Sequence, residues 1–304
     1  MNNYSSFSLK IVLLSLLLFS CFFASKSSAD VIRIKIPPAR SDFDISHDYH
    51  IKLLTKALQH SMPEISIEFY DSVPMSQGRA ETELIKGEKI DVYWFGTNTD
   101  IEQKLRAIPI PTTRGLIGFR KLLINKKLIS NFDEVRNLKD LQTHIACQGT
   151  HWPDTKILNN AGLAVTTSTD YENLFQMTSK GRCDYFPRGY HDAINELKIR
   201  QNTYPALISY DRIMLHYPFA VYFFTNKSNL ELALQIELGL HHMAKTGGIL
   251  SFMKTHPLTR PIFPITSEAQ SLYLPITNPY ISNNNFSDRL YWFTPQDFDI
   301  TNAQ

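Results

Sequence analysis

Cysteine, net charge and long apolar runs are all scarce in this sequence. Only three of the 304 residues are cysteine, and the formal net charge at pH 7 is +2. That small excess comes from residues 1–29, which contain Lys10 and Lys26 and no acidic residue, so the remaining chain is formally neutral. A neutral chain gives no support for nucleic-acid binding, which requires a clustered basic face. We therefore expect no nucleic-acid partner.

The short motifs of common catalytic and metal sites are also missing. The sequence contains no Gly-x-Ser-x-Gly elbow, no glycine loop that cradles a phosphate and no dinucleotide fingerprint. His47 and His50 could share a helix face, but no third ligand follows at short range. His241 and His242 are adjacent and would point in different directions on a helix. We therefore expect a protein that is not an enzyme and that holds no metal or cofactor.

The one long apolar run, residues 11–23, lies near the start of the chain. It follows Lys10 and precedes the small residues Ser27, Ser28 and Ala29. It is shorter than the roughly 20 residues of a membrane span and is typical of a cleaved signal peptide, here residues 1–29. An uncleaved anchor and lipidation of Cys21 are the alternatives. No later stretch is long and apolar enough to span a bilayer.

The rest of the chain is organised around two extended segments, residues 115–126 and 216–227, which both end in Asn-Lys. A complete α/β pattern lies between them and another lies outside them. This arrangement predicts two doubly wound α/β lobes joined by a two-stranded hinge, with a cleft of the kind that ligands favour. The expected boundaries are residues 30–117 and 218–264 for the first lobe, 118–217 for the second lobe and its hinge strands, and 265–304 for an irregular tail packed on the body.

Alternating and continuous apolar runs predict the individual elements. In the first lobe, strands are expected at 31–36, 66–70 and 90–95, with helices at 46–60, 77–86 and 99–106. In the second lobe, strands are expected at 143–150, 164–167 and 183–186, with helices at 137–141, 154–161, 169–180 and 191–200. Two more helices, 230–245 and 249–256, are expected after the chain returns to the first lobe.

The two cysteines outside the leader, Cys147 and Cys183, fall in the first and third predicted strands of the second lobe. Such strands usually lie side by side, and an even pair of cysteines in an oxidising compartment suggests a disulfide. The alternative is a pair of buried free thiols.

The element order, with Leu138-Lys139-Asp140-Leu141 leading into a strand that ends Gln148-Gly149-Thr150, resembles the type II periplasmic solute-binding proteins of amino-acid-type ABC importers. The resemblance covers nearly all of the chain after the leader and is to a divergent branch of that family. It implies a periplasmic monomer that closes on a small-molecule solute by hinge bending and delivers it to an inner-membrane ABC permease. A periplasmic sensor of the same fold is the alternative, and a secreted hydrolase is a third possibility, for which the sequence offers no reactive constellation.

Ligands of open α/β sheets lie beyond the carboxyl ends of the strands. This rule selects the loops at residues 40–44, 94–97, 148–154 and 187–190. The two extended segments that connect the lobes add further side chains, including Arg120 and His216. The candidate ligand-binding residues are Arg40, Asp42, Trp94, Thr97, Arg114, Gly149, Thr150, Trp152, Arg188 and Tyr217.

Backbone amides of Gly149 and Thr150, at the start of a predicted helix, could bind an anionic group; the alternative is a plain turn with a threonine cap. Trp94 and Trp152, one from each lobe, could stack on a solute or could pack beneath their own loops.

Arg188 is the most informative departure from the family. The resemblance places there an aspartate that holds the ligand ammonium, and it places the arginine that clamps the ligand carboxylate at Glu102, with Arg106 and Arg114 close enough to substitute. Both departures argue against an ordinary α-amino acid. Because a guanidinium binds a carboxylate, phosphate or sulfonate bidentately, the sequence favours an anionic solute. The alternative for Arg188 is a structural ion pair with Asp184 or Asp192.

Overall fold

The computed structural model describes residues 31–39, 42, 44–63, 66–71, 75–282 and 285–300. The predicted signal peptide and the candidate ligand residue Arg40 lie outside this part of the chain. Among the helices in the described ranges, none has the length and apolar character needed to cross a membrane.

The first lobe contains two groups of strands that adjoin each other. In the first group, β1 (Val31–Ile36) pairs in parallel with β2 (Ser66–Asp71). In the second, β10 (Val221–Thr225) lies between β3 (Val92–Gly96) and β4 (Arg106–Ile108) and is antiparallel to both. The groups meet where the amide of Asp91 donates to the carbonyl of Lys35 at 2.9 Å.

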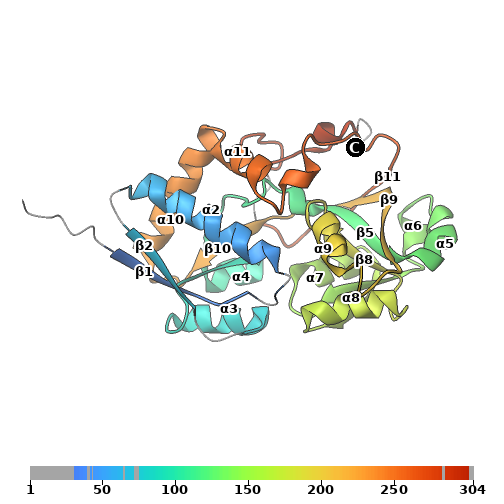
Figure 1. The fold of residues 1–304 in the computed structure, drawn as a ribbon, viewed down its shortest axis with the longest axis horizontal. Coiled ribbons are helices and arrows are strands. Elements are labelled where there is room, and N and C mark those ends of the chain that lie inside the picture. The colour runs from blue at the N-terminus through green and yellow to red at the C-terminus, as the bar shows by residue number, and fades with distance from the viewer. Residues whose placement is uncertain are drawn as a thin grey trace, which may run out of the picture.

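Five helices cover these strands (Figure 1). They bury one large apolar cluster that includes Leu53 and Leu54 from one helix and Ile236 and Leu240 from another. The helices are α2 (Ile45–Ser61), α3 (Gln77–Lys86), α4 (Thr99–Lys104), α10 (Leu230–Lys245) and α11 (Gly248–Thr255).

The second lobe is built on a six-stranded mixed sheet in the order β11-β9-β5-β8-β6-β7. Neighbouring residues of one strand point to opposite faces, so Leu122 packs in the cluster on one face and Leu123 in the cluster on the other. The strands are β5 (Phe119–Asn125), β6 (Ile145–Gly149), β7 (Ala164–Ser168), β8 (Tyr185–Gly189), β9 (Leu207–His216) and β11 (Leu272–Pro275). The helices are α5 (Ile129–Asp133), α6 (Leu138–Leu141), α7 (Pro153–Asn160), α8 (Tyr171–Ser179) and α9 (Asp192–Arg200).

The predicted fold class, two α/β lobes joined by a hinge, is confirmed, but the second extended segment, residues 216–227, differs from the prediction. Residues 216–227 do not form one strand, because β9 ends at His216 and β10 begins at Val221. Pro218 lies in the break, where a residue without an amide hydrogen cannot extend the ladder. The two extended segments are in contact where the Tyr217 amide donates to the Gly118 carbonyl at 3.2 Å. A Cβ on Gly118 would lie 2.3 Å from the Tyr217 carbonyl oxygen, so this approach requires glycine.

Two further elements differ from the sequence-based expectation. The strand predicted to stop at Pro187 continues to Gly189, so Arg188 lies on β8 rather than in a loop. Pro187 is tolerated there because only Tyr185 of β8 pairs with β6. The tail, expected to be irregular, contributes β11, which pairs in parallel with the end of β9.

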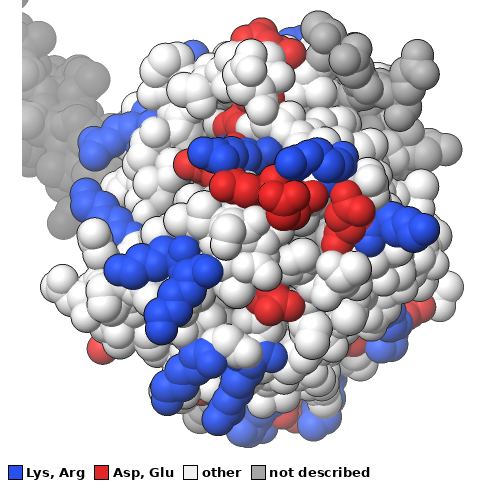
Figure 2. Space-filling model, turned by 90° about the vertical axis from the view of Figure 1, so that its right-hand side faces the viewer, with Lys and Arg blue, Asp and Glu red and all other residues white. Residues whose placement is uncertain are grey.

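The outer end of the second lobe carries side chains of both charges (Figure 2). On this face a row of acidic side chains lies beside a row of basic ones, and further Lys and Arg side chains lie in separate groups. One contact between opposite charges at this end joins Arg212 to Asp133 at 2.7 Å.

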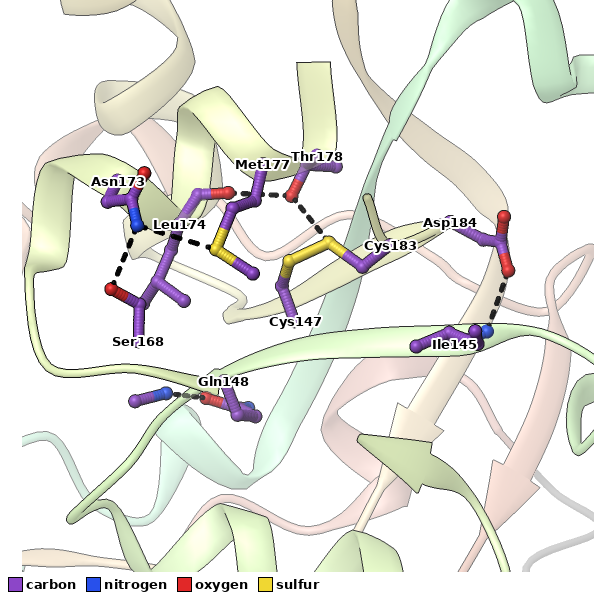
Figure 3. The surroundings of a disulfide bond; sticks show 11 residues. Ile145, Cys147, Gln148, Ser168, Asn173, Leu174, Met177, Thr178, Cys183 and Asp184 are labelled. Carbon is purple, nitrogen blue, oxygen red and sulfur yellow. Dashed lines mark hydrogen bonds between the residues drawn. A yellow bond between two sulfur atoms is a disulfide. The ribbon is translucent and has the colours of Figure 1, made fainter. Parts of the chain in front are cut away.

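The predicted disulfide between Cys147 and Cys183 is confirmed (Figure 3). The two Cα atoms are 5.6 Å apart, within the range that a disulfide spans. Cys147 lies on β6, whereas Cys183 lies two residues before β8 and not within a strand. Both sulfurs are buried under α8, where the Thr178 hydroxyl is 3.4 Å from the Cys183 Sγ. The bond therefore joins β6 to the segment that leads into β8, inside one of the second lobe's two cores.

Candidate functional site

A cavity of about 90 Å³ lies where the two lobes meet. The first lobe contributes His50 and Trp94 to its lining, and the second contributes Trp152 and His191. Arg120 enters from β5, next to the hinge. The cavity therefore contacts both lobes and the hinge at once, as a site for a solute that stabilises closure must.

Arg120 is the central charge of this cavity and is only 2% exposed. Its Nη2 lies 2.5 Å from Oδ1 of Asp154, in the first turn of α7, and the same oxygen accepts a hydrogen bond from the Tyr217 hydroxyl at 2.5 Å. The guanidinium also lies over the Tyr217 ring, 4.9 Å from its centroid. Its Nε has no hydrogen-bond partner among the described residues. Arg120 is thus held in place with an unused donor.

Two other lining residues also hold buried polar atoms without a hydrogen-bond partner in the described part of the chain: Thr113, through Oγ1, and His191, through Nδ1. Leaving such an atom unsatisfied costs about 1–3 kcal/mol. Burial lowers the pKa of His191, so its ring is neutral near pH 7. Because its Nε2 faces the Asp192 carboxylate at 3.4 Å, the ring proton belongs there and Nδ1 is an acceptor. The cavity therefore offers a cationic donor, a hydroxyl and a neutral acceptor.

Arg188 lines the same cavity, but its charge is compensated within the second lobe. Its Nε and Nη2 donate to the two carboxylate oxygens of Glu196, each at 2.6 Å, while Asp192 is farther away at 3.8 Å. Burial raises the pKa of Glu196, but the ion pair with Arg188 outweighs burial and holds that pKa below its ordinary value. The main partner is thus a residue of α9 that the sequence did not single out. Asp184, one of the expected partners, instead accepts the Ile145 amide at 2.7 Å.

Trp94 and Trp152 both line the cavity, one from each lobe. Trp94 is stacked between His50 and Tyr93, with ring centroids 4.8 Å from each. Trp152 lies against the Arg188 guanidinium, whose carbon is 5.1 Å from the ring centroid. Each tryptophan packs in its own lobe and also faces the cavity.

Gly149 and Thr150 line a neighbouring cavity of about 350 Å³, which Trp152 also lines. The Thr150 amide donates to the Ser168 carbonyl at 3.0 Å. A Cβ on Gly149 would lie 2.4 Å from the Trp152 ring, so the tryptophan can occupy this position only beside a glycine. Trp152, like Gln77, therefore lines both cavities.

Other candidate residues lie outside the lining of the Arg120 cavity. Thr97 donates to Glu102, Arg114 donates to the Arg289 carbonyl in the tail, and Asp42 is exposed. Tyr217 lies behind Asp154. Thr113, His191 and Asp192 line the cavity but were not among the candidate ligand-binding residues; Asp192 was considered only as an ion-pair partner of Arg188.

The comparisons with known proteins identify the fold. No protein-family model matches the chain, and a search of the curated proteins finds no relative. An ancestral arginine-binding protein bound to arginine matches with a TM-score of 0.53 and 17% identity over 75% of this chain and 98% of the other. The arginine-specific periplasmic binding protein of Salmonella typhimurium matches with a TM-score of 0.55 and 13% identity over 75% and 99%. The chain has the fold of a type II periplasmic binding protein.

The same fold occurs in a sensor. A histidine kinase sensor domain with similarity to periplasmic binding proteins matches with a TM-score of 0.53 and 16% identity over 75% of this chain and 96% of the other. At these identities the similarity shows a shared periplasmic-binding-protein fold. The solute and the partner must be inferred from the residues of the site.

His216, at the hinge end of β9, predicts an acid sensitivity. Burial, with a further contribution from the Arg120 charge, lowers the pKa of His216 to about 3. The unfolded chain would protonate this ring below about pH 6.5 and the folded protein would not, so stability is full above pH 6.5 and falls as the pH drops toward 3. Between pH 7 and pH 5 we expect His216→Asn to reduce the loss of unfolding free energy by about 2 kcal/mol.

Urea unfolding of both proteins at pH 7.0 and pH 5.0 measures this difference. Burial also lowers the pKa values of His191 and His256, so some pH dependence should persist in the variant. Equal pH dependence in the two proteins would contradict the prediction.

Proposed function

We propose that this chain is an extracytoplasmic solute-binding protein that closes on a small polar solute in the Arg120 cavity. The observation that carries the proposal is the set of buried polar atoms on Arg120, Thr113 and His191 that have no hydrogen-bond partner among the residues that the structure describes. Buried polar groups are normally hydrogen-bonded, and a solute that supplies the missing partners would recover the cost of desolvating them. Because these atoms come from the hinge region and the second lobe, while His50 and Trp94 come from the first, such a solute would favour the closed arrangement.

The chemistry of the cavity supports a solute with an anionic group. A guanidinium with a free donor fits a carboxylate or a similar anion, and the acceptor Nδ1 of His191 fits an N–H or O–H elsewhere on the solute. We propose that Arg120 binds the anionic group, although the sequence favoured Arg188 for this role. Glu196 already accepts hydrogen bonds from two donors of Arg188.

We further propose delivery of the solute to an inner-membrane ABC importer. The sensor role is the second candidate, and the similarity to a histidine kinase sensor domain supports it. Pull-down with the permease or the sensor encoded nearest to this chain distinguishes the two, since only the true partner should bind in a solute-dependent manner.

Native mass spectrometry of the protein purified without refolding tests solute binding. We expect a discrete added mass that disappears on denaturation. Arg120→Gln should remove it, because truncating one member of a buried charged contact costs about 2–5 kcal/mol, or at least about 30-fold in affinity. Arg106→Gln is the matched control, since Arg106 is an exposed arginine on β4. A bare mass for the wild type, together with no thermal shift by amino acids or dicarboxylates, would overturn the proposal.

Thr113→Val separates binding from folding. The Thr113 hydroxyl has no hydrogen-bond partner among the described residues, so its removal should leave the unfolding free energy unchanged or slightly higher. If the hydroxyl contacts the solute, affinity should fall about tenfold, the value of one hydrogen bond. Isothermal titration with the solute identified by mass, beside urea unfolding, measures both quantities. Unchanged affinity would exclude Thr113 from the contact.

A further inference from the structure

The C-terminal segment runs from the second lobe across the hinge to the first lobe. At its second-lobe end, β11 pairs with β9 along four residues, from Leu272 opposite Ile213 to Pro275 opposite His216. At its first-lobe end, the Tyr291 hydroxyl is hydrogen-bonded to Nδ1 of His241 on α10, and the two rings are stacked. The segment is therefore anchored in both lobes.

Between these two anchors, residues 276, 278 and 280 form hydrogen bonds to the end of β9, to the hinge and to α4, in that order. The Ile276 amide donates to the carbonyl of His216, the last residue of β9, at 2.8 Å. The Asn278 side chain donates to the carbonyl of Pro218, in the hinge crossing, at 2.8 Å. The Tyr280 carbonyl then accepts the Thr99 amide at the start of α4, also at 2.8 Å.

A further contact follows on the first lobe, where the Ser282 hydroxyl donates to Glu102 at 2.5 Å. These three bonds lie within five residues, each of which spans at most about 3.6 Å, so the link between the lobes is short. Moving the lobes apart would break the bond of Tyr280 to Thr99 or the bond of Asn278 to Pro218.

This chain is longer than the fold it shares with the similar structures. Those structures are covered almost completely, to 98% in one case, while only 75% of this chain is covered.

We propose that residues 272–282 form a strap that restrains the opening of the two lobes and so regulates solute entry and release. The consequence for solute exchange rests on the solute-binding function proposed above, but the mechanical restraint does not. The expected behaviour without solute is a narrow range of lobe separations, centred near the separation in this structure.

Spin-label distance measurements test the strap without any solute. Labels on Lys56→Cys in α2 and Lys139→Cys in α6, both exposed positions, report the lobe separation, with Cys21→Ser present and the native disulfide intact. Inserting eight Gly and Ser residues after Thr277, which is exposed, lengthens the strap and removes none of its anchors. We expect a longer mean distance and a distribution about twofold wider, as for a released hinge.

The same insertion after Gln270 is the matched control. Gln270 is exposed and precedes β11, while Glu268 just before it pairs with Lys121 of the second lobe at 2.7 Å. The residues on both sides of this insertion lie on the second lobe. We therefore expect the same distribution of distances between the two labels as in the protein without an insertion. Asn278→Ala with Ser282→Ala should give an intermediate width.

Identical distributions for the unmodified strap and the Thr277 insertion would overturn the proposal, and so would equal broadening by both insertions. Failure of solute binding alone would leave these distances unchanged, so the two proposals fail separately.

Discussion

Arg188→Met is expected to destabilise the protein by about 3–5 kcal/mol, because it leaves the Glu196 carboxylate buried without its ion-pair partner. Arg188 is 8% exposed and Glu196 is 4% exposed, and two hydrogen bonds of 2.6 Å join them. After the substitution, Glu196 retains the hydroxyl of Tyr171 at 2.5 Å, which is a neutral donor. Urea unfolding at pH 7 measures the change.

The double variant Arg188→Met with Glu196→Leu is the control for this prediction. Replacing both members of a buried pair by apolar side chains is often close to neutral, so most of the lost stability should return. At pH 5 the single variant should be less destabilised than at pH 7, because an uncompensated buried carboxylate takes up a proton more easily. A loss below about 1 kcal/mol for the single variant would show that the pair is not buried as described.

Removing the disulfide with Cys147→Ala and Cys183→Ala is expected to cost about 4 kcal/mol, from the freedom regained by the unfolded chain across this loop. The two cysteines are 36 positions apart, and both are buried in the core beneath α8. Guanidinium unfolding of the double variant and of the wild type, with and without reductant, measures the effect.

Reductant should shift the wild-type transition to that of the variant and should leave the variant unchanged. Because the bond lies wholly in the second lobe, the lobe separation reported by the labels on α2 and α6 should not change. A variant that unfolds at the wild-type denaturant concentration would contradict the prediction.

Much of the fold could be predicted because the relevant signals are local. Helices α3 and α10 begin and end where the sequence indicated, and Gly87 and Gly247 follow them. The local sequence pattern gave a wrong strand end where pairing with a neighbouring strand determined the structure. Pro187 is an ordinary strand-ending signal, yet β8 continues through it because its partner β5 pairs along the whole strand.

The candidate site was predicted in part. Trp94, Trp152 and Arg188 reach the cavity, as does Arg120 from the crossing, because strand ends and the lobe junction can be located from element order. His191 was missed because the loop was taken to end one residue earlier, and Asp192 was considered only as an ion-pair partner of Arg188. The pairing of Arg188 with Glu196 has no local signature that distinguishes it from pairs with Asp184 or Asp192; the orientation of α9 against β8 selects it.

The sequence by itself determined the neutral charge balance and the two-lobed α/β order and suggested the disulfide pair, since composition, periodicity and cysteine number require no knowledge of distant contacts. The tertiary structure alone decided which buried polar atoms lack partners and where the tail runs. Lys121 and Glu268, for example, are 147 positions apart and meet at 2.7 Å. Such a contact depends on how the lobes and the tail pack, and no pattern along the chain encodes that packing locally.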